Sequence, residues 1–201
     1  MRTTTSGPGA PAGLGIVLGG RGGQGILLAS EILAEAAVRR GVEVLGSETH
    51  GMAQRGGSVV SHIKVGKGPG PLVGQGEADV LISLERVETY RNLPILRNGG
   101  ACFANFAEAD TLDPRVQAYM EKAGISFHRL DADRIAAAAG VPQGCNVVLI
   151  GLFASWPSCP FSRDELRAAL EAVVPEKFRA KNLEAFERGC AAGKTLLSGA
   201  A

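Results

Sequence analysis

The first apolar stretch of the chain, residues 14–19, is short and continuous, which is typical of a strand buried on both faces. A glycine-rich run, Gly-Gly-Arg-Gly-Gly-Gln-Gly, follows at 19–25. Over 26–38 the apolar residues recur three and four positions apart, with Glu and Arg between them. The pattern predicts a central strand that turns sharply into a helix.

The same exchange of strand and helix patterns continues to residue 130. It predicts strands at 42–45, 58–65, 79–84, 100–105 and 125–130, and helices at 85–96 and 114–122. Residues 58–65 alternate, which indicates an edge or antiparallel strand with His62 on its wetter face. We expect plain structural or surface roles for His62 and His128. The fold class is therefore α/β, an open, mostly parallel Rossmann-like sheet with helices on both faces.

Beyond residue 130 only helical patterns follow, at 133–139, 146–156, 164–174 and 177–197. Ser162 and Glu165 have the spacing of a capping box at the start of the third. We expect one domain over 14–201, with a sheet part at 14–130 and a C-terminal helical extension, or cap, at 131–201. Residues 1–13 are mostly Thr, Ser, Gly, Pro and Ala, which predicts a disordered tail.

Composition excludes several classes of partner and site. The 201 residues are 45% hydrophobic, and the net charge is only +1 with scattered Lys and Arg. Neither nucleic acid nor a membrane surface is an expected partner, no apolar run is long enough to span a bilayer, and we expect a cytoplasmic protein. The cysteines are far apart and show no Cys-x-x-Cys step, which predicts incidental thiols and no metal site: Cys102, Cys145, Cys159 and Cys190.

The glycine-rich run satisfies the G-x-G-x-x-G pattern between a strand and a helix, so it is a candidate cradle for an anionic cofactor. A dinucleotide site also needs an acidic residue at the end of the second strand. Glu43 lies within that strand and Glu48 lies beyond a Gly-Ser step, so neither fits. The glycines equally fit a role in close packing of helix and strand. The candidates for cofactor contact are Gly20, Arg21, Gly22, Gly23, Gln24 and Gly25.

A second polar segment, predicted as a loop over 47–57, carries Glu48, His50, Gln54 and Arg55. Such a density of groups able to transfer protons or recognise charge exceeds what a turn requires. The carboxyl ends of neighbouring parallel strands open onto one crevice, so both loops are expected to face the same ligand or partner.

Two of these motifs and three later segments resemble one family. The chain is similar to the gamma-type domain of the 2-oxoacid:acceptor oxidoreductases, most of all to indolepyruvate ferredoxin oxidoreductase beta subunits. The resemblance extends from Gly15 to Leu197. Its carriers are Gly-x-Gly-Gly-Gln-Gly with Ile-Leu-Leu-Ala-Ser-Glu-Ile-Leu, the segment from Glu48 to Val59, Ala78 to Leu81, Asn146 with Leu149 and Gly151, and Lys181 to Gly189.

The resemblance implies oxidative decarboxylation of an aryl 2-oxoacid with coenzyme A to an acyl-CoA, with electrons passed to ferredoxin. It places thiamine diphosphate and 4Fe-4S clusters in a larger partner subunit, so this chain would bind no cofactor tightly, carry no catalytic residue and act in a hetero-oligomer that meets ferredoxin through that subunit. Arg55 is the first candidate for an anionic group of substrate or coenzyme A, because its planar fork pairs with carboxylate or phosphate. Glu48 and His50 are candidates for orienting the substrate.

Two other functions stay open from the residues alone. One is a self-contained Rossmann-type enzyme that binds NAD(P) or flavin, and the other is a nucleotide-sensing domain without catalysis. Within the family, phenylpyruvate, indolepyruvate, phenylglyoxylate and smaller acids all fit, because the substrate pocket would be shared with another chain.

Overall fold

The computed structural model describes residues 13–50, 56–66 and 70–198. In this part of the chain the strands form one six-stranded sheet in the order β2-β3-β1-β4-β5-β6. Every strand except β3 runs parallel to β1. The strands are β1 (Leu14–Arg21), β2 (Val44–His50), β3 (Ser58–Val65), β4 (Ala78–Ser83), β5 (Leu96–Asn105) and β6 (Ser126–Leu130).

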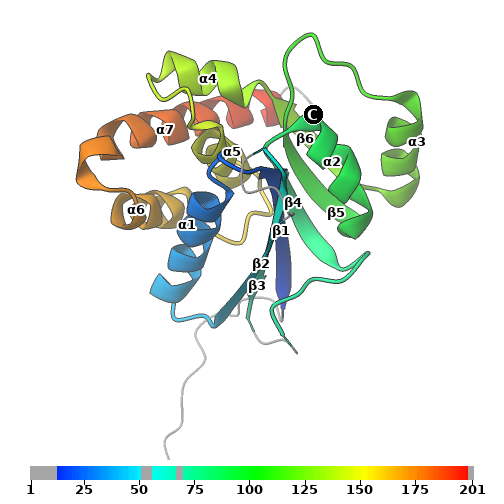
Figure 1. The fold of residues 1–201 in the computed structure, drawn as a ribbon, viewed down its shortest axis with the longest axis horizontal. Coiled ribbons are helices and arrows are strands. Elements are labelled where there is room, and N and C mark those ends of the chain that lie inside the picture. Colours follow the sequence, from blue (N-terminus) through cyan, green and yellow to red (C-terminus); the bar gives the residue numbers. More distant parts are fainter. Residues whose placement is uncertain (1–12, 51–55, 67–69, 199–201) are drawn as a thin grey trace, which may run out of the picture.

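Helices cover both faces of this sheet, as Figure 1 shows with the sheet seen nearly edge-on. On one face lie α2 (Arg86–Asn92), the short helix η1 (Leu93–Ile95) and α3 (Pro114–Ala123). The other face carries α1 (Ile26–Arg39), α4 (Ala132–Ala138), α5 (Cys145–Ala154), α6 (Arg163–Val173) and α7 (Glu176–Ser198). The predicted α/β class, with a mostly parallel Rossmann-like sheet and a C-terminal helical extension, is confirmed.

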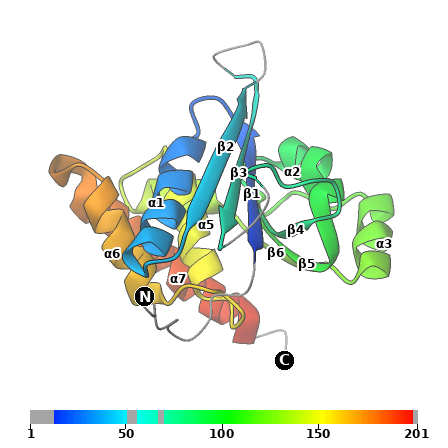
Figure 2. The same ribbon diagram turned by 90° about the horizontal axis from the view of Figure 1, so that it is seen from below.

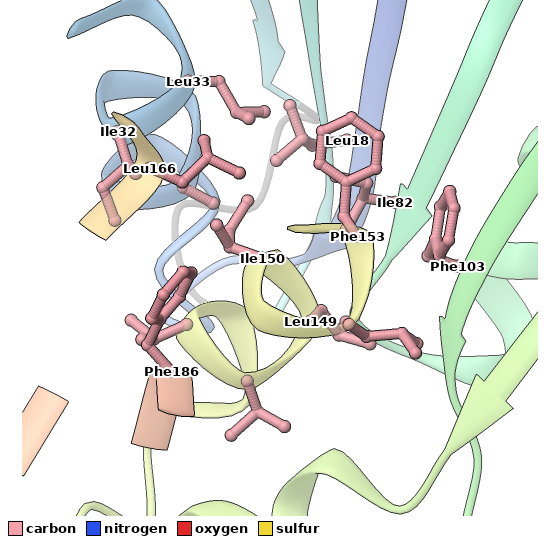
Figure 3. Packing of buried hydrophobic residues seen from close by; sticks show 14 of the residues in the cluster. Leu18, Ile32, Leu33, Ile82, Phe103, Leu149, Ile150, Phe153, Leu166 and Phe186 are labelled. Atoms are coloured by element: carbon pink, nitrogen blue, oxygen red, sulfur yellow. The ribbon is translucent and has the colours of Figure 1, made fainter. Parts of the chain in front are cut away.

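The larger core lies between the sheet and the α1–α5–α7 layer. Helix α5 is buried on all sides, and Figure 3 shows its side chains between those of α1 and the strands. It can approach α7 closely because both helices carry glycine at the contact. A Cβ added to Gly189 would collide with the carbonyl of Val148, and one added to Gly151 would collide with that of Phe186. The small residues therefore set the distance between the two helices.

The burial of strand β1 explains its continuous apolar sequence. Ile16, Val17 and Leu18 have no exposed surface, because β1 lies between β3 and β4 with helices on both faces. The continuous apolar pattern thus corresponds to a central strand, as predicted. Strand β3 is antiparallel to both of its neighbours, which confirms the antiparallel alternative for 58–65.

Three local predictions were wrong. Strand β2 does not end at residue 45 but continues to His50, because it pairs with β3 along its whole length, up to His50 opposite Val59. His62 is buried and not on a wet face, since the backbone amide of Val73 covers it and donates to its Nδ1 atom at 3.3 Å. Strand β5 begins at Leu96 and not at residue 100, so the predicted helix over 85–96 ends before Leu96, and the register against β4 shifts near the start of β5.

Candidate functional site

The candidate site lies at the carboxyl edge of the parallel strands. There β1 ends at Arg21, next to the start of β3 at Ser58, and β2 ends at His50 opposite Val59. The amide of Gly22 donates to the carbonyl of Gly57 at 2.9 Å, so the glycine-rich turn and the end of the second loop are joined by a hydrogen bond. The two predicted loops therefore do meet at one edge of the sheet.

Within the glycine-rich turn, most of the described amide donors are already used. The amide of Arg21 donates to Oε1 of Gln24 at 2.7 Å, and the amide of Gln24 donates to the carbonyl of Arg21 at 3.1 Å. Together with the bond from Gly22, three amides of the turn donate within the protein. A phosphate cradle needs such amides free to point at the anion.

Arg21, the charged residue of the turn, is directed to a carboxylate of the same chain. Its guanidinium lies 3.6 Å from Oε1 of Glu85, and about half of the Arg21 side chain is exposed. Glu85 in turn caps helix α2, since its side chain accepts a hydrogen bond from the amide of Glu88. Through this ion pair the turn contacts the connection between β4 and α2, and the charge of Arg21 is compensated within the chain.

Gly25 is the glycine of this turn that the fold most requires. It begins α1 in the left-handed conformation, with φ of 76°, and a Cβ there would lie 2.5 Å from Nδ2 of Asn146. Asn146 is buried at the start of α5 and donates from Nδ2 to the carbonyl of Gly25 at 2.9 Å. The close approach of the helical extension to the turn explains why both residues stand where they do.

Residues 47–50 of the second segment belong to strand β2 and not to the predicted loop. Glu48 and His50 lie on β2, while Arg55 and Gln54 fall outside the described residues. Glu48 lines an open groove of about 330 Å³ between β2 and α1, together with Ser30, Glu31 and Gly46. Within the described residues, the two predicted substrate candidates lie two positions apart on the edge strand.

A buried carboxylate at this edge was missed by the sequence interpretation. Glu88 is 3% exposed, accepts from the Ser58 hydroxyl at 2.7 Å and pairs with Arg91 at 2.5 Å. These contacts attach the base of β3 to helix α2 and satisfy the buried charge. The available signal was position, because Glu88 follows the carboxyl end of β4, where site residues of parallel sheets gather.

A second polar group fixes the far side of the same edge. Asn105, at the end of β5, donates to Asp133 at 2.8 Å and accepts from the amide of Ala132 at 2.9 Å. It is 7% exposed. These bonds fix the start of α4, so the helical extension is attached to the sheet at both Asn105 and Asn146.

The histidines and thiols have structural surroundings. Burial lowers the pKa of His62 below its ordinary value, with Lys64 adding to the effect, and burial alone lowers that of His128. The His128 ring stacks on Phe103 with centroids 5.1 Å apart. Burial, with Asp133 adding to it, raises the pKa of the Cys145 thiol to about 12. Both imidazoles are therefore neutral at neutral pH, and this thiol stays protonated.

Among the described residues, no three His, Cys, Asp or Glu side chains are grouped as metal ligands would be. None of the described helices has the length and apolar character to cross a membrane.

Comparison with known proteins gives a consistent set of relatives. Residues 15–192 match the family of pyruvate ferredoxin/flavodoxin oxidoreductases. The indolepyruvate oxidoreductase subunit IorB of Thermococcus kodakarensis is 38% identical, over 90% of this chain and 96% of its own length. The 2-oxoglutarate synthase subunit KorC of Methanocaldococcus jannaschii is 28% identical, over 90% and 94%.

Solved structures share the fold. The gamma subunit of a keto/oxoacid ferredoxin oxidoreductase from Geobacter sulfurreducens superposes with a TM-score of 0.74 at 24% identity, covering 90% of this chain and 99% of its own. A 2-oxoglutarate:ferredoxin oxidoreductase from Magnetococcus marinus gives 0.75 at 23%, covering 93% of this chain but 32% of that longer chain. With the match over residues 15–192, this chain belongs to the pyruvate ferredoxin/flavodoxin oxidoreductase family.

Proposed function

We propose that this chain is the subunit without clusters of a thiamine-diphosphate-dependent 2-oxoacid:ferredoxin oxidoreductase. The complex would oxidatively decarboxylate an aryl 2-oxoacid, such as indolepyruvate, to an acyl-CoA and pass the electrons to ferredoxin. The observation that carries the proposal is the 38% identity with an indolepyruvate oxidoreductase subunit over nearly the full length of both chains. The 28% identity with a 2-oxoglutarate synthase subunit is lower, which favours the aryl substrate.

In this proposal the larger partner subunit holds thiamine diphosphate and the 4Fe-4S clusters, which supply bond cleavage and electron transfer. This chain contributes a wall of the site at its carboxyl edge. Arg55 would bind an anionic group of the 2-oxoacid or of coenzyme A, and Glu48 and His50 would orient the substrate. The buried Glu88 carboxylate supports this role indirectly, because it accepts a hydrogen bond from Ser58 at the start of β3.

The alternative of a self-contained NAD(P) or flavin enzyme has less support. A dinucleotide site uses the acidic end of the strand next to β1, yet here β3 lies between β1 and β2. At about 4.8 Å per strand, Glu48 is about 10 Å from β1 in the plane of the sheet. The turn amides that already donate within the protein also argue against a dinucleotide site. We therefore favour a packing role for Gly20 to Gly25 over a role in cofactor binding. The same argument counts against a nucleotide-sensing domain.

We further propose that residues 14–201 act as one domain, a sheet part at 14–130 with a helical cap at 131–201. In support, one buried cluster contains side chains from both parts. The Phe103 ring of β5 packs against Phe153 of α5 and against Trp156, with centroids 5.3 and 5.5 Å apart.

Purification of the chain alone and with its larger subunit tests the proposal. We expect the isolated chain to lack oxidoreductase activity and to bind neither iron nor thiamine diphosphate, and the complex to reduce ferredoxin with an aryl 2-oxoacid and coenzyme A. Stoichiometric iron and iron–sulfur absorbance in the isolated chain would contradict this. Tight binding of NAD or FAD by a lone chain would favour the self-contained enzyme, and nucleotide binding without a catalytic complex would favour the sensing domain.

A further inference from the structure

The two outer strands of the sheet differ in how they are protected. Strand β6 has five residues, and its Arg129 side chain donates to the carbonyl of Asp110, in the segment that follows β5. Strand β2 has seven residues, pairs with β3 without a bulge and contains neither Lys nor Pro. Figure 2 shows β2 on the outside of the sheet. Proteins usually block such an edge with short strands, bulges, Lys or Pro, so β2 is an open pairing edge in the part of the chain that the structure describes.

The direction of each β2 amide follows from two backbone hydrogen bonds. Gly66 donates to the carbonyl of Glu43, so Glu43 and Gly66 form a hydrogen-bonded pair, and pairs of this kind alternate along an antiparallel ladder. Leu45, Ser47 and Thr49 therefore bond to β3. The bond from Gly22 to Gly57 agrees with this alternation, because it makes the odd-numbered residues of β3 bond to β1 and leaves the even-numbered ones to bond to β2. The amides of Val44, Gly46 and Glu48 point away from β3, toward the open edge.

The same three residues line the groove of about 330 Å³ between β2 and α1. Gly46 leaves its floor open, since the nearest atom to an added Cβ is the carbonyl oxygen of His62 at 3.9 Å. A strand added at the edge would place every second side chain over this groove, because neighbouring strands share one face. The edge thus offers backbone bonds and a pocket together, as in recognition by strand addition.

The charges of the groove select the occupant. Glu31 of α1 is exposed and has no ion pair or hydrogen bond among the described residues, and Glu48 lies on the same groove. A second copy of this chain would bring a further Glu31 carboxylate to the groove, and like charges repel. The groove is complementary to an extended segment that places a basic side chain near Glu31 and an aliphatic side chain above Gly46.

We propose that an extended segment of the larger partner subunit adds to β2 as a seventh strand, with a basic and an aliphatic side chain over the groove. This inference rests on the proposed function, because it needs that subunit. It is distinct from the substrate role of the hairpin, since it uses the backbone of Val44, Gly46 and Glu48.

Amide hydrogen exchange of the chain, alone and in the assembled complex, tests the pairing. We expect the amides of Val44 and Gly46 to exchange fast in the isolated chain and to become protected in the complex, while those of Leu45, Ser47 and Thr49 are protected in both. An alternating change is specific to strand addition, because side-chain docking would not select every second amide. Unchanged exchange at Gly46 in an assembled complex would overturn the inference and leave the proposed function standing.

Substitutions give a second measurement. Gly46→Pro removes the outward amide without removing a bond to β3, and we expect it to weaken subunit association by about ten-fold or more, with Gly46→Ala as the matched control. Glu31→Lys should also weaken association, whereas Glu121→Lys on α3 should not. Normal association of both test variants would overturn the inference, as would a homodimer of the isolated chain that Gly46→Pro dissociates. A chain that never associates with the larger subunit would instead overturn the proposed function.

Discussion

The glycine-rich turn and the β2–β3 hairpin meet at one edge of the sheet but differ in what their polar groups do. In the turn, three amides and the Gln24 side chain bond within the protein, and Arg21 pairs with Glu85. In the hairpin, Glu48 lines an open groove and the outward amides of β2 have no neighbouring strand. A glycine motif between strand and helix therefore does not by itself identify a ligand site; the hydrogen bonds already made decide which groups stay available.

The difference has a structural cause. The turn lies between β1 and helix α1, and Asn146 of α5 closes on it from the helical extension. Arg21 and Gly23 are exposed, and Gly22, Gln24 and Gly25 are partly buried, so partners within the chain, and not exclusion of water, occupy the polar groups of the turn. Strand β2 lies at the margin of the sheet, where one side stays open among the described residues. Function is therefore better sought in the hairpin, and substitutions at three positions, with a control at Gly23, test that comparison.

The largest effect is expected at Gly25. Gly25→Ala places a Cβ at a φ of 76° and 2.5 Å from Nδ2 of Asn146, so it strains the backbone and displaces a buried hydrogen bond. The cost in unfolding free energy should be roughly 2–4 kcal/mol. For a domain of this size, Tm should then fall by about 5–15 °C, measured by calorimetry of the chain.

Gly23→Ala is the matched control for this substitution. Gly23 also has a positive φ, 99°, but nothing lies within 4 Å of an added Cβ. It should therefore lose only the conformational part, about 1 kcal/mol. An equal loss at both positions would show that backbone conformation alone, and not the contact with Asn146, makes the turn depend on glycine.

The sequence predicted this fold well where one pattern determined one element. Continuous apolar runs indicated the buried β1 and β4, and Ser162 with Glu165 forms the predicted capping box at α6. The order of the strands was not predictable, because an antiparallel strand after β2 can be placed on either side of it. The insertion of β3 between β1 and β2, which removes the dinucleotide geometry, is a property of the tertiary structure.

The site was predicted less completely, for a related reason. The sequence identified Glu48 as a candidate polar residue but placed it in a loop, because its position on a strand depends on pairing with Ser61 of β3. Glu88 looks like an ordinary helix residue until Ser58 and Arg91 are seen around it. Among the glycines, sequence alone selected Gly22 as readily as Gly25, although only Gly25 of the two has a positive φ.

The intermediate effect is expected at Arg55, which lies between β2 and β3 in the sequence. If its guanidinium pairs with an anionic group of substrate or coenzyme A, Arg55→Lys keeps the charge but loses the planar fork, and Arg55→Ala loses both. A charge-assisted pair contributes roughly 1.5–3 kcal/mol, so Arg55→Ala should lower kcat/KM by about one to two powers of ten, with Arg55→Lys in between. Steady-state kinetics for both substrates on the assembled complex give the values.

Subunit association of the same two variants separates binding from structure. An Arg55→Ala complex that dissociates, while the surviving complex has normal kinetics, would assign Arg55 to the subunit interface. A variant that is assembled and kinetically normal would remove the hairpin from substrate binding altogether, and the comparison between the two loops would then reduce to a difference in exposure.

The smallest effect is expected at Arg21, the arginine of the turn, which is the natural counterpart of Arg55. Arg21→Ala removes a half-exposed pair with Glu85 at 3.6 Å and keeps the backbone bond to Gln24. Exposed pairs contribute roughly 0–1 kcal/mol, so Tm should change by no more than about 4 °C and kcat/KM by less than about two-fold. Added salt should shrink even this change, because it screens exposed charges. A loss of kcat/KM as large as that of Arg55→Ala, with intact assembly, would contradict the comparison and make the turn a contact for the anionic ligand.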